Sequence, residues 1–383
     1  MKPHKPHKLH KPRKYRVEFR KNRAARPRAS DLTRAIDSDP DHVDRLAATE
    51  RLSGKGELTR KRTVVGTEGN RADGLPIARA TTGSWRGRVL FVNGLVSAVE
   101  RPDGRVVRCT TRRVLRTMAT EQRHVVTAGD WVEASGDRDE GVIESIEPRG
   151  TSLCRTSRGR RHVIVANVDQ VVIVGSVAKP NLKPGLIDRF LVAAESAGIR
   201  PLICLNKADL VDPASLVPLA GVYARMGYPV ILCSAASGLG LRRLEAELPG
   251  KVTAVVGQSG VGKSSILNSL EPGLELVIGD VSDENEKGRH TTTTARLIPH
   301  RHGGHFVDTP GIRQFQLWQT VAAEVPSAFR DLRPFANHCR FPNCSHTHES
   351  PCAVKDAVAD GLLDTRRWES CCQLVSEDGA EEE

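Results

Sequence analysis

Hydrophobic residues follow two different patterns along this chain. From residue 162 to about residue 315, short apolar runs rich in β-branched residues alternate with longer segments in which apolar residues recur every three or four positions. The runs at 171–174 and 201–205 are typical of buried parallel strands, and the segment 186–194 is typical of an amphipathic helix packed on them. We therefore expect an α/β architecture, a parallel sheet with helices on both faces.

Residues 85–146 show a shorter period. Turn dipeptides such as Asn-Gly and Asp-Gly recur there every 8 to 12 residues or so, which favours a small β-barrel of the OB-fold type. Periodicity alone does not separate an OB-fold from an SH3-like barrel. The predicted strands are 88–92, 96–99, 105–109 and 131–134. Four arginines form a candidate RNA-facing edge, or else a solvated basic rim: Arg112, Arg113, Arg116 and Arg123.

The net charge of +11 is concentrated at one end of the 383-residue chain. Residues 1–28 carry twelve Lys or Arg against a single acid, Glu18, so they account for the whole excess. The segment lacks the apolar residues that would offset the entropy lost on ordering, so we expect it to be disordered alone. Counterion release makes such a tail a salt-sensitive RNA binder; a merely solubilising tail is the alternative. Residues 29–80 are interpreted as a linker.

Membrane and secretory classes are disfavoured by the sequence. No apolar run approaches the roughly 18 residues needed to cross a bilayer, and no signal-peptide core follows the basic N-terminus. The nine cysteines form no paired framework, and three of them cluster with a histidine. We expect a cytoplasmic protein with reduced cysteines and no membrane partner.

A glycine-rich stretch carries the clearest chemical signal. Residues 257–264 match G-x-x-x-x-G-K-[S/T], after the apolar run 252–256 and before the helical pattern 265–270. In this setting backbone N–H groups surround phosphate oxygens, the lysine supplies positive charge and the last hydroxyl completes an Mg²⁺ shell. The phosphate-binding candidates are Gly257, Gln258, Ser259, Gly260, Val261, Gly262, Lys263, Ser264 and Ser265.

Guanine selectivity is predicted by an N-K-x-D motif at 206–209, directly after a strand pattern. The Asp209 carboxylate can accept from the ring N–H and the exocyclic amine of guanine, an edge that adenine does not present, and Lys207 can lie over the base. A second strand pattern, 229–233, leads into S-A-A-S-G, where a backbone N–H can read the guanine O6. The base-binding candidates are Asn206, Lys207, Ala208, Asp209, Ser234 and Ala235.

Two further loops complete a nucleotide switch. In the D-x-x-G motif at 308–311, Asp308 holds Mg²⁺ through water and the Gly311 N–H senses the γ-phosphate. The polar loop 288–294, with four consecutive threonines, supplies a switch threonine, for which Thr292 is the candidate. The predicted magnesium residues are Ser264, Thr292 and Asp308.

The order of these motifs indicates a circular permutation. Ordinary GTPases run from the phosphate loop through the switch threonine and D-x-x-G to N-K-x-D and Ser-Ala, whereas here the last two come first. Permutation is tolerable because domain termini usually lie close together at the surface. The D-x-x-G loop now leads directly into the C-terminal region, so we expect the nucleotide state to bias the position of that region.

A cysteine and histidine cluster follows the nucleotide motifs. Three thiolates and one imidazole within fourteen residues are what a closed tetrahedral zinc site needs, and the soft ligand set favours zinc over hard cations. With no open position, the role is structural. His338 and His348 are neighbours that compete for the imidazole position. The predicted zinc ligands are Cys339, Cys344, His346 and Cys352.

Taken as a set, the motifs of this chain resemble those of the ribosome small subunit-dependent GTPase A family over about residues 84–370. The motifs that carry the resemblance are N-K-A-D, S-A-A-S-G, G-Q-S-G-V-G-K-S-S, G-R-H-T-T-T, D-T-P-G-I-R and the Cys/His cluster. The resemblance implies an OB-fold before the GTPase domain and zinc ligands matching those above. It also implies GTP hydrolysis coupled to late maturation of the 30S subunit, with rRNA and the subunit as partners, GTP and GDP as ligands, and release on hydrolysis. The extension from residue 29 to about residue 80 departs from the compact family pattern.

The residue that positions the attacking water is harder to assign. Just after D-x-x-G, where many GTPases have Gln, stands Ile312, which cannot hydrogen-bond. His290, beside the switch threonines, is the nearest polar candidate, although it also fits an ordinary loop histidine. The resemblance supports it, because it lies in the family's G-R-H-T-T-T motif. With Lys263 it forms the predicted catalytic pair, and we expect slow turnover alone and stimulation by the small subunit.

The predicted domains are a basic disordered extension and linker (1–83), an OB-fold-like barrel (84–150), a circularly permuted P-loop GTPase domain (151–318) and a helical zinc-binding module with an acidic tail (319–383). A monomer is expected. Two alternatives stay open: a nucleotide-gated RNA-binding assembly module whose hydrolysis is incidental, and a nucleic-acid-binding regulator acting through the basic tail. Loss of Asp209 would leave the second unaffected.

Overall fold

The computed structural model describes most of the chain beyond residue 82. The described residues are 13–19, 60–66, 83–113, 115, 125–136, 139–157, 160–274, 295–308 and 324–379. Within them, none of the helices is both long and apolar enough to cross a membrane.

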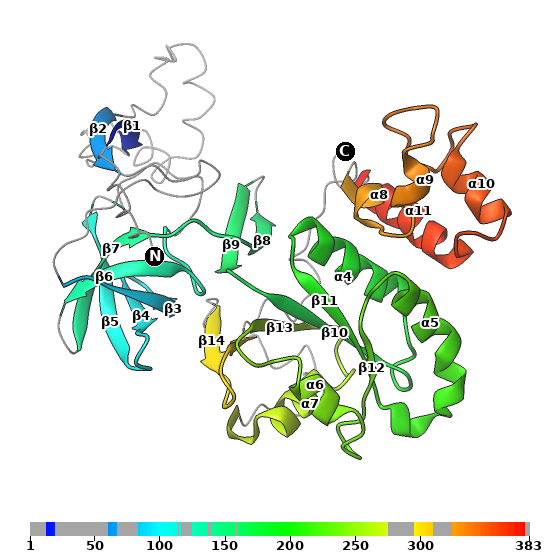
Figure 1. Cartoon of the computed structure of the whole chain (residues 1–383), viewed down its shortest axis with the longest axis horizontal. Coiled ribbons are helices and arrows are strands. Elements are labelled where there is room, and N and C mark those ends of the chain that lie inside the picture. Colours follow the sequence, from blue (N-terminus) through cyan, green and yellow to red (C-terminus); the bar gives the residue numbers. More distant parts are fainter. Residues whose placement is uncertain are drawn as a thin grey trace, which may run out of the picture.

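A parallel sheet forms the centre of the molecule (Figure 1). Five parallel strands lie in the order β12-β11-β10-β13-β15, and β14 adds antiparallel to β15. The predicted α/β fold is therefore confirmed. The strands are β10 (Gln170–Ser176), β11 (Arg200–Asn206), β12 (Val230–Leu232), β13 (Val252–Val256), β14 (Arg296–Pro299) and β15 (His305–Asp308).

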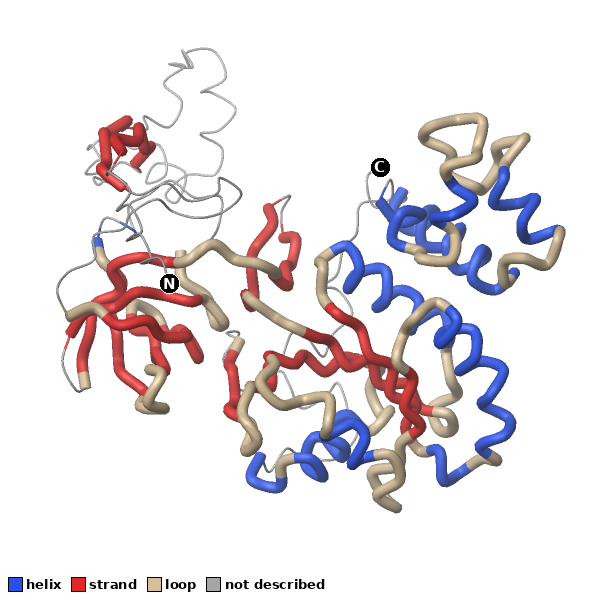
Figure 2. The backbone as a smooth tube through the Cα atoms, in the orientation of Figure 1, coloured by secondary structure: helices blue, strands red, loops and turns tan. Residues whose placement is uncertain are grey.

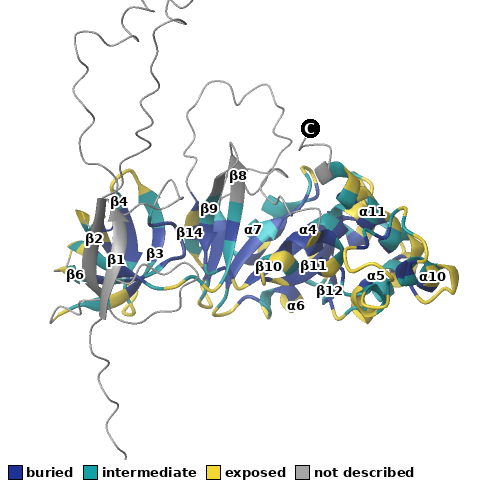
Figure 3. Ribbon diagram, turned by 90° about the horizontal axis from the view of Figure 1, so that it is seen from above, coloured by how far each residue is buried: buried dark blue, intermediate teal, exposed yellow. Residues whose placement is uncertain are grey.

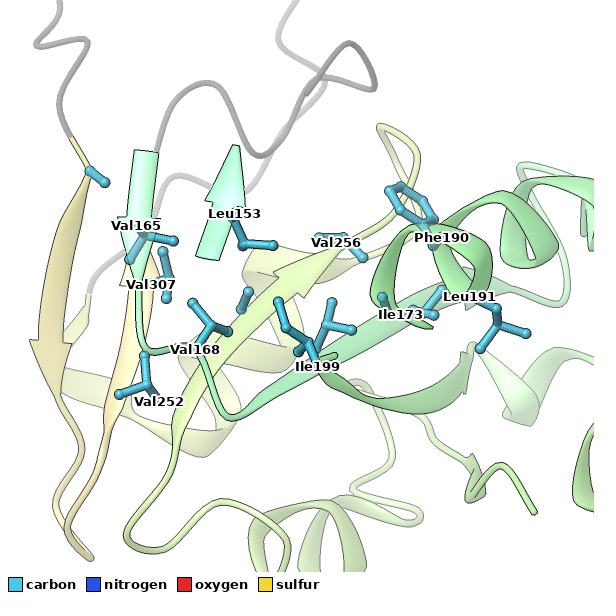
Figure 4. Close-up of a cluster of buried hydrophobic side chains, with 14 of the residues drawn as sticks. Leu153, Val165, Val168, Ile173, Phe190, Leu191, Ile199, Val252, Val256 and Val307 are labelled. Carbon is cyan, nitrogen blue, oxygen red and sulfur yellow. The ribbon is translucent and has the colours of Figure 1, made fainter. Parts of the chain in front are cut away.

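Helices cover both faces of this sheet because its strands are apolar on both sides. Alternate residues of β10 point to opposite faces: Val171 and Ile173 join the core beneath one pair of helices, and Val172 and Val174 join the core beneath the other. Figure 4 shows the first core, where Phe190 packs above the sheet. The first pair is α4 (Pro184–Ser196) and α5 (Val217–Arg225), and the second is α6 (Leu241–Glu245) and α7 (Lys263–Leu270).

A five-stranded barrel precedes the nucleotide domain. Its order is β3-β4-β5-β7-β6, closed by pairing of β3 with β6 (Figure 2). It encloses a separate apolar core. The predicted barrel is confirmed, but the sequence analysis did not name its strand β7, where the exposed Val142 interrupts the usual alternation. The strands are β3 (Trp85–Asn93), β4 (Val96–Glu100), β5 (Val106–Thr111), β6 (Trp131–Gly136) and β7 (Glu140–Ile146).

The barrel and the nucleotide domain share one sheet. Strand β14 pairs with β15 on one side and with β3 on the other, where Arg296 is opposite Phe91, so eleven strands are continuous. Buried residues run across the junction, as the dark regions of Figure 3 show. A separate hairpin, β8 (Ser152–Ser157) with β9 (Arg160–Ala166), follows the barrel in the chain.

The N-terminal extension contains a strand pair that the prediction of a disordered segment did not include. Strand β1 (Arg13–Phe19) pairs antiparallel with β2 (Arg60–Gly66). A sequence signal was available: Tyr15, Val17 and Phe19 alternate with charged residues, which is the period of a strand. The remaining residues of 1–82 lie outside the described part.

In the described residues beyond 323, four helices form the C-terminal module, and the first and last of them pack on α4. Val192 of α4 joins their core together with Phe329, Leu332 and Val354. The helices are α8 (Val325–Ala328), α9 (Arg333–Ala336), α10 (Ala353–Ala359) and α11 (Thr365–Gly379).

Buried ion pairs fasten this module to the nucleotide domain. The Arg367 guanidinium, 1% exposed, donates to Asp188 of α4 at 2.6 Å and to both oxygens of Asp331 at 3.0 Å. Tyr223 and Arg366 also donate to Asp188, at 2.8 and 3.2 Å. Burial lowers the pKa of Arg367, but Asp331 and Asp188 outweigh it and raise that pKa above its ordinary value. Both oxygens of the buried Asp188 carboxylate accept hydrogen bonds, so the network fixes how α11 sits on α4.

Replacing Arg367 with Met should destabilise this packing strongly. It leaves the buried Asp188 carboxylate without its closest cation, and breaking a buried pair in this way costs about 3–5 kcal/mol. Arg333→Met is the matched control, because Arg333 also joins the module to α4, through Glu195 at 3.0 Å, but is half exposed; we expect about 0–1 kcal/mol there. Urea unfolding measures both. Equal losses in the two variants would contradict this account of the network.

Candidate nucleotide site and metal centre

The predicted guanine and phosphate loops meet at one edge of the sheet. Strand β10 pairs in parallel with β11 and with β13, so the loops that follow β11 and β13 emerge side by side at the carboxyl ends. The phosphate loop occupies the turn between β13 and α7, which begins at Lys263. Gly257 and Gly262 have φ of 146° and 94°, in the region that favours glycine, and a side chain at Gly262 would collide with Asn206. The two loops are therefore in direct contact.

Asn206 joins three loops through its side-chain amide. The group is 2% exposed; its Nδ2 donates to the carbonyl of Val261 at 2.8 Å, and its Oδ1 accepts from the N–H of Ala235 at 3.2 Å. Because both ends of the amide are used, Asn206 acts here as a brace between the phosphate loop and the Ser-Ala loop. The sequence analysis predicted a base-binding residue without this bracing role.

Lys207 and Asp209 lie on the solvent side of that brace. Lys207 has φ of 63°, and its Nζ donates to the carbonyl of Gly260 at 2.8 Å and to that of Lys179. Asp209, in a short 3-10 turn, is exposed, so its carboxylate is accessible to a base. The loop after β10, which includes Lys179, has no role in the sequence-based predictions. The parallel pairing of β10 and β11 places this loop beside the N-K-x-D turn.

The remaining base-reading candidates are held by the backbone. Ala208 is buried, with its N–H donating to Cys233 at 3.0 Å, and Ser234 is buried with its Oγ accepting from the N–H of Ser237 at 3.0 Å. The Ala235 N–H is bonded to Asn206. These contacts fix the loop after β12 against the N-K-x-D turn.

Lys263 points back into the phosphate loop. Its Nζ donates to the carbonyls of Gly257 and Gln258, at 2.8 and 2.7 Å. Ser264 and Ser265 follow in the first turn of α7, and Asp308 ends β15, the strand that pairs with β13. The loop thus contains a cation and ends in two hydroxyl residues, and a carboxylate ends the neighbouring strand, which suits a phosphate with its Mg²⁺. His290, Thr292, Gly311 and Ile312 lie outside the described residues.

A cavity of about 520 Å³ separates the phosphate loop from the C-terminal module. It is bordered by Gln258, by the start of α4 at Lys183, and by Gln373 and Glu377 of α11. The nucleotide site and α11 therefore face a common space.

The four predicted zinc ligands come together in the C-terminal module. One ligand atom from each of Cys339, Cys344, His346 and Cys352 lies within 4.8 Å of the others, and all but Cys339 are buried. His346 has φ of 61°, and its Nδ1 is 3.5 Å from the Sγ atoms of Cys339 and Cys352. The cluster formed by these four residues is a three-thiolate, one-imidazole set that suits a structural Zn²⁺. Both competing histidines, His338 and His348, are exposed and do not belong to it.

The surroundings of the cluster fit a bound cation. Burial raises the pKa of the Cys344 thiol to about 12 and lowers the pKa of His346. A thiol in such a place becomes a thiolate when a divalent metal takes the proton's place. Trp368 and Cys372 of α11 orient the carbonyl of His346, with the indole N–H at 3.0 Å and the thiol at 3.7 Å. Metal binding would thereby fix α11 as well.

Asp209→Asn should reverse the base preference. The amide places a donor where guanine also donates, so GTP affinity should fall by at least about tenfold, given roughly 1.5–3 kcal/mol for a charged hydrogen bond, and xanthosine triphosphate should gain affinity. Asp212→Asn is the control, because that nearby exposed carboxylate only caps a turn through the Ala214 N–H. Competition against a fluorescent nucleotide measures the affinities of both variants for GTP and for xanthosine triphosphate. If ATP competes as well as GTP in the unmutated protein, the base-reading assignment is wrong.

Cys344→Ser should remove zinc and unfold the module around it, because metal binding and local folding are coupled. Nucleotide affinity should stay largely intact, since the ligands lie outside the phosphate and guanine loops. Cys372→Ser is the control, a neighbouring thiol outside the cluster, and should keep one zinc per chain. Elemental analysis of protein purified without chelators measures the zinc content of each variant. Absence of zinc from the unmutated protein would refute the site.

Comparisons with known proteins agree with this geometry. A family model described as RsgA GTPase matches residues 146–318. Proteins named Small ribosomal subunit biogenesis GTPase RsgA are 44% identical over 299 residues in Azotobacter vinelandii, covering 74% of this chain and 85% of that protein, and 43% identical over 294 residues in Pseudomonas aeruginosa (strain LESB58), covering 76% and 84%.

Solved structures give the same result. The crystal structure of YjeQ from Thermotoga maritima matches with a TM-score of 0.65 at 33% identity, over 77% of this chain and 98% of that one. The structure of YloQ, titled a circularly permuted GTPase, matches with a TM-score of 0.62 at 29% identity, over 79% and 99%. The predicted permutation and the resemblance are both confirmed. This chain belongs to the RsgA GTPase family.

Proposed function

We propose that this protein hydrolyses GTP and that hydrolysis is coupled to late maturation of the small (30S) ribosomal subunit. The structural observation that carries the GTPase half is the contact of the guanine loop with the phosphate loop through Asn206. The names of relatives that are 43–44% identical, Small ribosomal subunit biogenesis GTPase RsgA, support the ribosomal half. GTP favours attachment to the subunit, and hydrolysis releases the protein.

The site residues divide into three roles in this proposal. Asp209 accepts from guanine while Lys207 lies over the base, and the loop at Ser234 and Ala235 reads the O6 edge. The phosphate loop and Lys263 bind the phosphates; on binding, Lys263 exchanges the carbonyls of Gly257 and Gln258 for phosphate oxygens. Ser264, Asp308 and Thr292 would hold Mg²⁺, which would neutralise charge on the β- and γ-phosphates, and the Gly311 N–H would sense the γ-phosphate.

Hydrolysis needs a group that orients water, and we assign it to His290. The apolar Ile312 stands where many GTPases have Gln, and the imidazole of His290 lies beside the switch threonines in the G-R-H-T-T-T motif. Intrinsic turnover should be slow, because unassisted GTPases hydrolyse slowly until a partner completes the site. The small subunit is that partner.

The barrel supports an RNA partner. The Arg86 and Arg88 guanidinium groups stack on the Trp131 ring, with centroid distances of 4.0 and 4.3 Å, and Arg101 lies 4.6 Å from Trp85. Arg86 is exposed and the other four residues are half-buried. Accessible arginine planes and aromatic rings are what unstacked bases pack on. Of the predicted arginine edge, Arg112 pairs with Glu144 at 2.8 Å and Arg113 is exposed, while Arg116 and Arg123 lie outside the described residues.

We further propose a monomer in the cytoplasm. The guanine loop, the phosphate loop and Asp308 all come from one chain, so no second copy is needed to assemble the site. Subunit maturation takes place in the cytoplasm, and the basic segment 1–28 adds an electrostatic contact to rRNA there.

The test is GTP turnover with and without small ribosomal subunits. We expect stimulation of at least about tenfold, modest beside the roughly 10⁵-fold that activating partners reach elsewhere. His290→Ala should bind GTP and the subunit but lose the stimulation, whereas Lys263→Ala should fail to bind nucleotide. Large subunits and His302→Ala, an exposed histidine of the same domain, are the controls.

Two results would change this account. Turnover that does not respond to small subunits would refute the proposed function. Stimulation that survives in His290→Ala would remove that imidazole from the mechanism and leave the rest in place.

A further inference from the structure

The hairpin of β14 and β15 connects the nucleotide site to the barrel. Strand β14 begins at Arg296, directly after the segment that carries the predicted switch threonine, and β15 ends at Asp308, the first residue of D-x-x-G. Each end of the hairpin therefore continues into one predicted switch. A shift of the hairpin moves the anchors of both.

On its other side the hairpin is joined to the barrel by three kinds of contact. Arg296 pairs with Phe91 of β3 through the backbone, and its guanidinium lies 5.1 Å from that ring. The His305 Nε2 hydrogen-bonds Oε2 of Glu100, at the end of β4, at 2.9 Å. Apolar packing completes the junction, and the residues that share this core are Leu90 and Ala98 of the barrel with Ala295, Leu297 and Val307.

The Glu100–His305 hydrogen bond is the contact of this junction that depends most on geometry. The two side chains are 22% and 10% exposed, so water competes weakly for their hydrogen bond. Apolar packing tolerates small sliding, whereas a partly buried polar pair fixes the relative position of the two segments. The turn of the hairpin, which follows β14 and leads to His305, has a different attachment: Arg301 contacts Glu245 of α6 at 2.6 Å, within the nucleotide domain.

We propose that Glu100 and His305 are positioning residues through which the barrel sets the geometry of both switch segments. Docking of the barrel on the RNA of the small subunit then raises GTP turnover through this pair. The inference rests on the proposed function and adds the route by which the subunit acts. By linkage, the nucleotide must act back on the barrel to the same extent in binding free energy.

The test compares Glu100→Ala with Glu245→Ala. Both remove a partly buried carboxylate that binds a side chain of the hairpin, but only Glu100 belongs to the barrel. In Glu100→Ala the gain in subunit affinity from GDP to a non-hydrolysable GTP analogue should shrink by at least about fivefold, the lower end of typical coupling between sites. The subunit-stimulated kcat should fall with it, while KM for GTP and turnover measured without subunits stay unchanged. Glu245→Ala should keep full stimulation. His305→Gln, whose amide can donate to Glu100, should retain more stimulation than His305→Ala.

Several outcomes overturn the inference. Unchanged stimulation in Glu100→Ala refutes it alone, and equal losses in Glu245→Ala show a general weakening of the hairpin instead. Absence of stimulation in the unmutated protein refutes the proposed function and this route with it. Hydrogen exchange of the unmutated protein tests the same route without depending on the folding of a variant. The amides of β3 and β4 should exchange more slowly with a non-hydrolysable GTP analogue bound than with GDP bound. Equal exchange rates in the two states overturn the route.

Discussion

The hydrogen bonds of the Asn206 side chain hold the functional site of this protein together. In the permuted chain the guanine loop comes 55 residues before the Val261 carbonyl that this amide contacts. Parallel pairing of β10 with β11 and β13 brings the two loops to one edge, and the buried amide then fixes them to each other and to the Ser-Ala loop. Circular permutation changes the connections between these strands and leaves this arrangement of loops intact.

The flanking modules are attached to that core in two physically different ways. The zinc module is fastened to α4 by the buried network of Asp188, Arg367 and Asp331, so α4 and α11 are expected to move as one body. The barrel is attached through the hairpin that lies between the two switches. The sequence predicts that the D-x-x-G loop biases the zinc module, because that loop leads directly into it. The described contacts favour the barrel as the part that responds to nucleotide, with the zinc module as a fixed arm.

Features that depend only on residues close together in the sequence could be predicted from it. The phosphate loop, the N-K-x-D turn and the Cys/His cluster depend on residues within about fifteen positions, and the turn signals marked most of the barrel strands. Features that depend on distant pairing could not. The sequence around Asp188 does not indicate that its ion-pair partner, Arg367, lies 179 residues away. The junction of β14 with β3 likewise joins segments separated by some two hundred residues. The bracing role of Asn206 was missed for the same reason, because it depends on the loops that the fold places beside it.

The central claim is that nucleotide state and attachment to the small subunit are coupled in one chain. The most direct measurement is the affinity of the unmutated protein for small ribosomal subunits, by co-sedimentation at fixed salt, with a non-hydrolysable GTP analogue and with GDP. The account predicts tighter binding with the analogue and release with GDP. Equal affinity in the two nucleotide states would contradict it.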